Sequence, residues 1–452
     1  MNLNIGDRIK LDIRKQGING EGVGYYNRVA VFVPGSILKE TVNVEIVKTF
    51  SNYAIGSIIE IDRFSKKRVT PKCKFFDDCD GCQLQHIDYL EQLKIKQSII
   101  KQALRRYTSI NIEKLEINKT LEMEEAYCYR NRSEMVFRNT NFGLALGYFK
   151  VQSSQFVFVD ECVVNMKEVD LINQHCLKLM RKYKQKAFDN RNQEGILLRL
   201  LVNLSLSTKS ASVVFVVRRY HSVLKELANE LLSDLADVKS ISYSIDDSSS
   251  NNPMRNQMML LAGTDKIEVL SERFKLKISP AVFDQANLKQ VDNIEKTIEK
   301  IANISDKSVV FDFYCNAGRY SLLLAKSVNL VYAVDYSMEA IKDASINAKL
   351  NGLENIKFIA KHVETALQAL IERSIYADLL ILDPPRSGIS DQLIALILEA
   401  KPKQIIYVSS NPSTLAKNIA LLNELYKVKK IIPIDFLPQN IQVDSITQLE
   451  LK

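Results

Sequence analysis

The chain has 452 residues, of which 46% are hydrophobic and 25% charged, with a formal net charge of +8. This is the composition of ordinary soluble globular proteins, and the length predicts two or three domains. No charge-free apolar run is long enough to cross a bilayer, and the first residues lack the apolar core of a secretory signal. We therefore expect a cytoplasmic protein that acts as a monomer without a membrane partner. The basic charge suits a nucleic-acid partner, although an abundance of surface lysine gives the same balance.

Residues 5–61 contain short segments of alternating apolar and polar residues that are separated by glycine-containing turns. This pattern predicts a small β-barrel over residues 1–66. Its candidates for a face that follows a phosphate backbone are Lys10, Arg14, Lys15 and Arg28. The alternative is a packing module with solvated basic side chains.

Three of the seven cysteines lie within ten residues and form a C-x5-C-x2-C pattern: Cys73, Cys79 and Cys82. An odd cysteine count argues against a disulfide framework in a reducing compartment. Closely spaced thiolates can share an iron–sulfur cluster or a zinc ion, and the spacing leaves both open. A fourth ligand is required, and Cys162 is the best candidate, ahead of Cys128 and Cys176.

Residues 67–280 combine helical and strand patterns, which predicts a mixed α+β central domain. Residues 88–107 have apolar positions at helical spacing, whereas "LLRLLVNLSLS" and "SASVVFVVRR" have the character of strands.

Residues 281–452 alternate continuous apolar strands with helices, among them "SVVFDFY", "LVYAVDYS", "ADLLILDPP" and "QIIYVSS". This alternation predicts a doubly wound, mainly parallel, Rossmann-like α/β sheet. Ligands in such sheets bind outside the carboxyl ends of the strands.

The segment 309–325 is predicted to form a strand, a tight loop and a helix, with Asn316 and Gly318 in the loop. Asp335 follows Asp312 by 23 positions and ends the next strand, where an acidic residue accepts hydrogen bonds from ribose hydroxyls. One glycine favours S-adenosylmethionine over a dinucleotide, because no pyrophosphate has to be approached. A tight turn with a structural aspartate is the remaining alternative. Asp383 in "LDPPRSG" belongs to the site by its position at a strand end, unless it is only a helix cap.

Together these motifs resemble those of the RNA (uracil-5-)-methyltransferase family, within it most nearly the bacterial type that methylates a uridine of 23S ribosomal RNA. The resemblance covers nearly the whole chain. It is carried by a TRAM-like barrel, the cysteine pattern with "GCQLQH", "YRNRSEMVFR", "AVFDQAN", "FDFYCNAG", "LDPPRSG" and "YVSSNPSTLAKN".

The resemblance implies a [4Fe-4S] cluster held by the three clustered cysteines and Cys162. It implies that S-adenosylmethionine is surrounded by Gln285, Tyr314, Arg319, Asp335, His362 and Asp383. Residues near Arg130 and Arg132, with the TRAM-like domain, would grip RNA, and the target uridine would be flipped out of its stack.

Ser410 is the most consequential departure from the family pattern. C5 of uracil is a weak nucleophile, so these enzymes add a cysteine thiolate to C6, and the cysteine position is occupied here by Ser410. A serine hydroxyl needs an adjacent base, and none of the four histidines is near it in sequence. Asp444, the candidate base, stands where the family has Glu.

Two further departures lie in the cofactor loop, where Asn316 replaces a usual glycine and Arg319 a usual asparagine. Four changes in one site resemble drift more than a single substitution. Cys315 is a conceivable substitute thiol, but its position in the motif points toward the cofactor.

Three functions are therefore open. The first is methylation of uridine C5 in 23S ribosomal RNA, at a low rate because of Ser410. The second is a non-catalytic relative that binds ribosomal RNA during ribosome assembly. The third is a methyltransferase of the same fold with another target and no covalent step.

Overall fold

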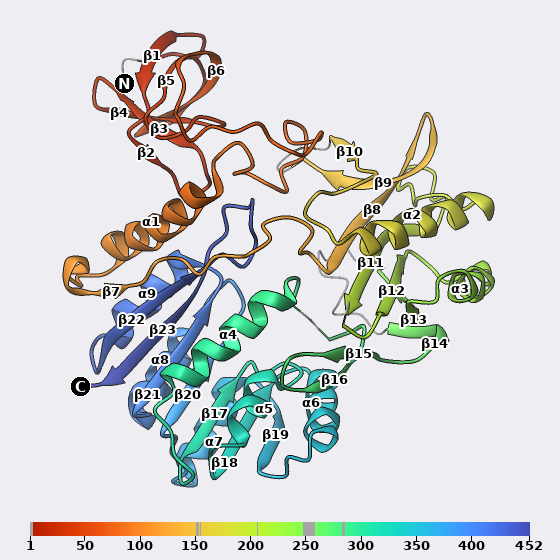
Figure 1. The fold of residues 1–452 in the computed structure, drawn as a ribbon, viewed down its shortest axis with the longest axis vertical. Coiled ribbons are helices and arrows are strands. Elements are labelled where there is room, and N and C mark those ends of the chain that lie inside the picture. The colour runs from red at the N-terminus through yellow and green to blue at the C-terminus, as the bar shows by residue number, and fades with distance from the viewer. Residues whose placement is uncertain (1–2, 151–152, 154, 206, 247–257, 283–284) are drawn as a thin grey trace.

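The computed structural model describes residues 3–150, 153, 155–205, 207–246, 258–282 and 285–452, arranged around three large sheets (Figure 1). Among these residues, no helix combines the length and the apolar character that crossing a bilayer requires.

The first sheet is a curled six-stranded barrel at the N-terminus with strand order β1-β5-β6-β4-β3-β2. Its strands are β1 (Arg8–Asp12), β2 (Lys15–Gln16), β3 (Gly22–Tyr26), β4 (Val29–Val33), β5 (Thr41–Thr49) and β6 (Tyr53–Arg63). The amide of Arg14 donates to the carbonyl of Val23 (2.9 Å) and brings the end of β1 back to β3. Alternate residues such as Val31, Val42 and Val44 fill the interior, as the period of two predicts.

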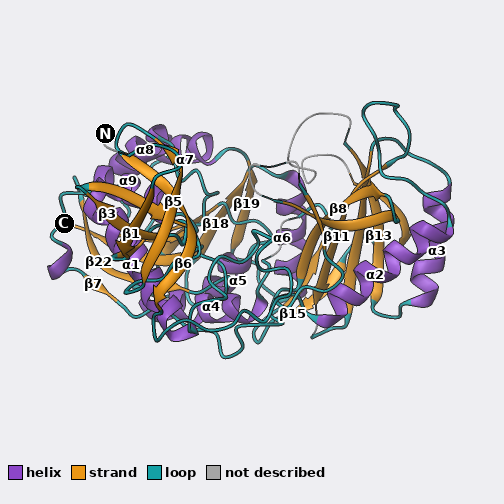
Figure 2. Cartoon of the chain, turned by 90° about the horizontal axis from the view of Figure 1, so that it is seen from above, coloured by secondary structure: helices purple, strands orange, loops and turns teal. Residues whose placement is uncertain are grey.

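The second, central sheet has seven strands in the order β10-β9-β8-β11-β12-β13-β14. The strands are β8 (Arg132–Thr140), β9 (Gly143–Phe149), β10 (Phe156–Phe158), β11 (Leu197–Ser205), β12 (Ser210–Val217), β13 (Val238–Ile245) and β14 (Met258–Gly263). Helices α2 (Lys167–Lys182) and α3 (Val223–Asp234) pack against it (Figure 2). The short hairpin of β15 (Ile267–Leu270) and β16 (Lys275–Ile278) follows and leads into the C-terminal part.

The third sheet has eight strands in the order β19-β18-β17-β20-β21-β23-β22-β7. The first five are parallel and β23 is antiparallel to β21, which confirms the predicted Rossmann-like arrangement. The strands are β17 (Val309–Phe313), β18 (Leu330–Asp335), β19 (Ile356–Ala360), β20 (Leu379–Leu382), β21 (Gln404–Ser409), β22 (Tyr426–Ile434) and β23 (Asp444–Leu451). The helices are α4 (Leu288–Ile301), α5 (Arg319–Ala325), α6 (Met338–Leu350), α7 (Val363–Glu372), α8 (Asp391–Ala400) and α9 (Pro412–Leu422).

One segment that the sequence assigned to the central domain packs instead with the C-terminal sheet. Helix α1 (Tyr89–Tyr107) lies on α9, and its apolar side chains, such as Ile99 and Leu104, share one core with the sheet. After the short 3₁₀ turn η1 (Ile112–Lys114), strand β7 (Glu116–Ile117) pairs with β22 at the sheet edge. The 67–280 boundaries stay a prediction, but α1 buries its apolar stripe on the C-terminal sheet, a partner that local sequence does not identify.

Candidate active site

The predicted site residues lie at the ends of neighbouring strands along one edge of the eight-stranded sheet. Asp335 ends β18, Tyr314 follows β17, Asp383 follows β20 and Ser410 follows β21. Asp444 begins β23, and because β23 is antiparallel to β21, its first residue lies at the same edge. The carboxyl edge of the parallel strands is where an open α/β sheet binds its ligand.

The loop after β17 has a strained backbone that presents its amides toward Asp335. Tyr314, Asn316 and Gly318 have φ angles of 62°, 49° and 88°. Asparagine tolerates this left-handed region better than most residues, so Asn316 keeps a conformation that glycine would adopt freely. Asp335 Oδ2 accepts from the Asn316 amide (3.1 Å), and Oδ1 accepts from the Ser337 amide (2.8 Å).

Arg319 opens helix α5 and faces a buried carboxylate on α4. Its guanidinium Nη1 lies 3.7 Å from Glu295 Oε1, and the Glu295 side chain is fully buried. Burial raises the pKa of Glu295 to about 7, while the charge of Arg319 opposes that rise. Gln285 lies two residues before Asn287, the N-cap of α4. Gln285 and Arg319, both predicted to contact the cofactor, are therefore both positioned with the help of α4.

His362, the N-cap residue of α7, stacks on Tyr336, with ring centroids 5.9 Å apart and planes 10° from parallel. Tyr336 directly follows Asp335 and is 62% exposed. The sequence analysis missed this tyrosine, although its position directly after a predicted ribose-binding aspartate could have drawn attention to it. A stacked pair with one open ring face is a suitable surface for a planar heterocycle.

Carboxyl groups with raised pKa values are concentrated beneath this edge. Burial raises the pKa of Asp383 to about 7, and the carboxylate of Asp444 adds to the rise, whereas a hydrogen bond from the Tyr320 hydroxyl opposes it. Burial also raises the pKa of Asp312 to about 7, although Ser321 Oγ donates to Asp312 Oδ2 at 2.5 Å. Such clustering of perturbed acids is characteristic of functional sites.

Ser410 and Asp444 are brought together by strand register. Ser409 of β21 pairs with Ser445 of β23, so the next residue along each chain, Ser410 and Asp444, lies opposite the other. Burial raises the pKa of Asp444 to about 6, and the positive charges of Lys96 and Arg386 oppose that rise. Within the described part of the chain, the Ser410 hydroxyl has no hydrogen-bond partner, so no base is in contact with it.

Cys315 does not supply the missing thiol. Its side chain is 4% exposed and packs with Ala333 and Ile341 beneath the sheet edge. Burial raises its pKa well above the ordinary value, so little thiolate is available.

The cysteine-rich segment lies between the barrel and α1, near the central sheet. Cys82 and Cys162 contact the same small apolar cluster around Tyr129. Burial raises the pKa of the Cys82 thiol to about 12, and the charges of Cys162 and Cys79 add to the rise. Cys176 is buried in the core between α2 and the central sheet, and Cys128 is exposed. Within the described residues, no three His, Cys, Asp or Glu side chains are arranged as a metal-binding group, so the cluster stays a prediction.

Arg130 lies near these cysteines. Burial lowers its pKa, but neighbouring tyrosine and cysteine side chains, Cys162 and Cys82 among them, raise it above the ordinary value. Its Nε atom is buried without a hydrogen-bond partner among the described residues, although the side chain as a whole is only partly buried. The expectation that residues near Arg130 and Arg132 grip RNA stays a prediction. Thiolates of a cluster would stabilise this cationic side chain, so the residues present fit an anionic cysteine-bound group.

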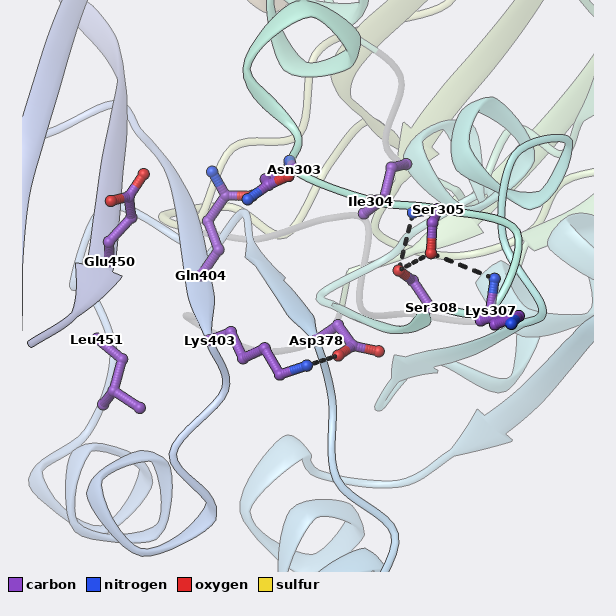
Figure 3. Close-up of a pocket in the computed structure, with 10 residues that line it drawn as sticks. All are labelled: Asn303, Ile304, Ser305, Lys307, Ser308, Asp378, Lys403, Gln404, Glu450 and Leu451. Atoms are coloured by element: carbon purple, nitrogen blue, oxygen red, sulfur yellow. Dashed lines mark hydrogen bonds and ion pairs between the residues drawn. The ribbon is translucent and has the colours of Figure 1, made fainter.

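A cavity of about 510 Å³ lies at the opposite edge of the sheet (Figure 3). It is lined by residues at the amino ends of β17, β20 and β21, such as Ser308, Asp378 and Gln404, and Lys403 pairs with Asp378 (2.7 Å) across it. The strained loop after β17 and the carboxyl groups with raised pKa values lie at the carboxyl edge of the sheet. The candidate site is therefore at that edge and not in this cavity.

Comparison with known proteins assigns this geometry to a family. The profile of the tRNA (uracil-5-)-methyltransferase family matches residues 88–450, and that of the TRAM domain matches residues 3–59. An uncharacterised RNA methyltransferase of Listeria monocytogenes is 33% identical over 449 residues, which is 99% of this chain and 98% of the relative. Another from Halalkalibacterium halodurans is 34% identical over 446 residues, 98% of this chain and 96% of the relative.

The solved structure of a Pyrococcus abyssi tRNA (uracil-54, C5)-methyltransferase, in complex with S-adenosyl-L-homocysteine, superposes with a TM-score of 0.74. It is 23% identical, and the match covers 98% of this chain and 100% of that one. The eight-stranded sheet is thus the fold of an S-adenosylmethionine-dependent methyltransferase. The chain belongs to the tRNA (uracil-5-)-methyltransferase family and carries a TRAM domain at its N-terminal end, which confirms the resemblance seen in the motifs.

Proposed function

We propose that this protein uses S-adenosylmethionine to methylate C5 of a uridine in 23S ribosomal RNA, and that its rate is low because Ser410 replaces the nucleophilic thiol. The observation that carries the proposal is the strand register by which Ser410 lies opposite Asp444. Family membership supports the reaction class. The choice of ribosomal RNA over transfer RNA rests on the resemblance of the sequence motifs to the type that methylates 23S ribosomal RNA.

The RNA partner is supported by the charge of the barrel surface. Arg14, Lys15 and Arg28 are exposed, whereas Lys10 is held by Asp62 at 2.6 Å. Exposed cations that can neutralise phosphates provide affinity that depends on salt but not on sequence. Base recognition would then be left to the carboxyl edge of the methyltransferase sheet. There a flipped uridine has to bring its C6 atom to Ser410 and its C5 atom to Asp444.

The residues divide the chemistry as follows. S-adenosylmethionine would supply the methyl group, and Tyr314, Asp335 and His362 are the residues proposed to hold it. A nucleophile adds to uracil C6 so that C5 attacks the methyl carbon, and a base removes the C5 proton before the nucleophile leaves. Asp444 suits the base, because a pKa raised to about 6 leaves a carboxylate with enough basicity near neutral pH. Ser410 without a contacting base is a poor nucleophile.

Cys73, Cys79, Cys82 and Cys162 would hold the proposed [4Fe-4S] cluster, which would act in structure or RNA positioning and not in redox chemistry. Support comes from the charge interactions that link Cys73 to Cys79 and Cys82 to Cys79 and Cys162, and from the buried Nε atom of Arg130. Anaerobic purification is expected to give a brown protein that contains iron and sulfide. A colourless protein that contains zinc would contradict the cluster.

Substitution of Ser410 by cysteine tests the nucleophile assignment. The Ser410→Cys variant is expected to form 5-methyluridine in 23S RNA faster than the native chain, or to accumulate a covalent RNA adduct visible by denaturing electrophoresis. Ser409→Cys is the matched control, because Ser409 is buried and its hydroxyl contacts the backbone of Asn411 (3.3 Å). Equal behaviour of the two variants would show that position 410 is not the nucleophile position.

The isolated hydroxyl of Ser410 also favours the second candidate, a non-catalytic protein that binds ribosomal RNA during assembly. The two functions differ in two measurements. Mass mapping of 5-methyluridine in ribosomal RNA, from cells with and without the protein, shows a lost modification only if the protein is an enzyme. Calorimetric titration with S-adenosylmethionine shows no heat if the chain is a binding module alone.

A further inference from the structure

The segment between β22 and β23, residues 435–443, forms a strap that leaves the sheet and returns with Asp444 at its end. Figure 1 shows this blue loop rising from the C-terminal sheet toward the orange segment that precedes α1. Most residues of the strap are buried although it has no regular secondary structure. Its hydrogen bonds therefore have to come from other parts of the chain.

The start of the strap is fixed to helix α1. Asp435 is fully buried, with Lys96 Nζ donating to its Oδ1 and the Tyr89 hydroxyl to its Oδ2 (2.7 Å). Lys96 Nζ also donates to the carbonyl of Leu437 (3.0 Å). This anchor holds the first residues of the strap but does not reach Asp444.

The end of the strap is fixed to the cysteine-rich segment. The amide of Leu84 donates to the carbonyl of Gln439 (2.9 Å), and the amide of Ile441 donates to Gln83 Oε1 (3.2 Å). Asn440 Nδ2 donates to the carbonyl of Gly81 (2.9 Å). These contacts surround Cys82, one of the predicted cluster ligands.

A continuous series of hydrogen bonds then leads from the cysteine segment to the candidate base. Asn440, held by Gly81, accepts the amide of Gln442 at its Oδ1 (2.8 Å). Gln442 Nε2 in turn donates to Asp444 Oδ1 (3.1 Å). Asn440 thus uses both polar atoms of its side chain, whereas Gln442 uses its main-chain amide toward Asn440 and its side-chain amide toward Asp444.

We propose that Asn440 and Gln442 are positioning residues through which the cysteine-rich segment holds the Asp444 carboxylate opposite Ser410. The role of Asp444 as base rests on the proposed function, but the coupling itself does not. The cysteine segment thereby acquires a task in the methyltransferase domain: loss of order around Cys82 releases the strap and, with it, Asp444.

Hydrogen–deuterium exchange on the full-length protein tests the coupling without requiring activity. In Asn440→Ala, which loses two hydrogen bonds, exchange over residues 439–446 is expected to be about tenfold faster, while exchange in β17 and β20 stays unchanged. Cys82→Ser is expected to act in the same direction. Gln97→Ala is the matched control, because Gln97 bonds the carbonyls of Ile117 and Asn118 on the other side of α1. Unchanged exchange over 439–446 in Asn440→Ala would overturn the coupling.

A kinetic readout separates positioning from general loss of structure. In the Ser410→Cys background, Gln442→Leu is expected to lower kcat about tenfold at unchanged KM for RNA, and to move the acidic limb of the pH profile upward, because the amide of Gln442 lowers the pKa of Asp444. The other charged groups that act on Asp444 are left in place: Lys96, Arg386, Asp435 and Asp383. An equal change in kcat and KM, or an unmoved pH limb, would contradict a positioning role. An inactive Ser410→Cys protein would count against the proposed function, and the exchange experiment would still decide the coupling.

Discussion

The buried pair of Lys96 and Asp435 offers the sharpest test of how the strap is stabilised. Both side chains are completely buried, and the ammonium of Lys96 contacts Asp435 and the carbonyl of Leu437. Lys96→Met keeps the length and apolar stem of the side chain but removes its charge. The carboxylate of Asp435 then stays buried with only the Tyr89 hydroxyl as a side-chain partner.

The expected loss in the free energy of unfolding of Lys96→Met follows from the cost of leaving the buried charge of Asp435 unpaired. Removing one partner of a buried ion pair costs about 3–5 kcal/mol, more than the pair contributes over two neutral residues. Each 1.4 kcal/mol is a factor of ten, so opening of this region is expected to become about 10² to 4 × 10³ times more frequent.

This loss is measured by urea unfolding of the full chain, monitored by circular dichroism. It is also measured by hydrogen–deuterium exchange of the amides in α1 and in residues 435–443. Lys94→Met is the matched control, because Lys94 lies on the same helix with 68% of its side chain exposed, paired with Glu91. It is expected to unfold like the native chain. The double variant Lys96→Met, Asp435→Asn removes the stranded charge and is expected to recover most of the loss. If Lys96→Met lowered the free energy of unfolding by less than about 1 kcal/mol, Lys96 and Asp435 would not form a charged pair that stabilises the strap.

Three further outcomes are expected. In the Ser410→Cys variant, release of tritium from [5-³H]uridine RNA is expected to fall about tenfold per pH unit below about pH 6 and to stay level above it. The reason is that the raised pKa of Asp444 keeps this base protonated in acid. A flat pH profile would contradict Asp444 as base. Gly318→Ala is expected to cost about 1–2 kcal/mol by urea unfolding, because φ is 88° and the added Cβ would lie 3.0 Å from that of Ala344. Tyr336→Ala is expected to weaken S-adenosylmethionine binding about tenfold by calorimetry, because the ring that stacks on His362 is lost; unchanged affinity would place the cofactor elsewhere.

The sheet that carries the site was predictable because its strands are buried on both faces. Segments such as 309–313 and 379–382 are continuously apolar, so each reports its own environment without reference to distant residues. The positions of Asp335 and Asp383 at this edge could also be predicted, since a polar residue that ends a buried parallel strand lies at the ligand-binding edge of the sheet.

Features that depend on distant partners were not predictable. The insertion of β23 between β21 and β22, which brings Asp444 to Ser410, is set by pairing across the sheet and has no local signal. The pattern around Arg130 resembles a basic RNA-binding motif, and only the folded structure shows that its Nε atom is buried. Strap residues such as Asn440 have the composition of an ordinary turn, and their role follows from hydrogen bonds to residues far away in sequence.

The four departures from the family pattern differ in consequence, and this changes how the site is understood. Asn316 adopts the left-handed conformation of the loop, and Arg319 has a buried carboxylate partner in Glu295. Asp444 reaches the position opposite residue 410 through strand register and is held there by Gln442. These three substitutions are accommodated by their surroundings, so they do not indicate a site that has lost its structure through drift. Ser410 alone lacks a compensating group, because an alcohol in place of a thiol requires a base and no described residue hydrogen-bonds to its hydroxyl. If this reasoning is right, one substitution, Ser410→Cys, is sufficient to restore the covalent step, and restoring the other three family residues adds little.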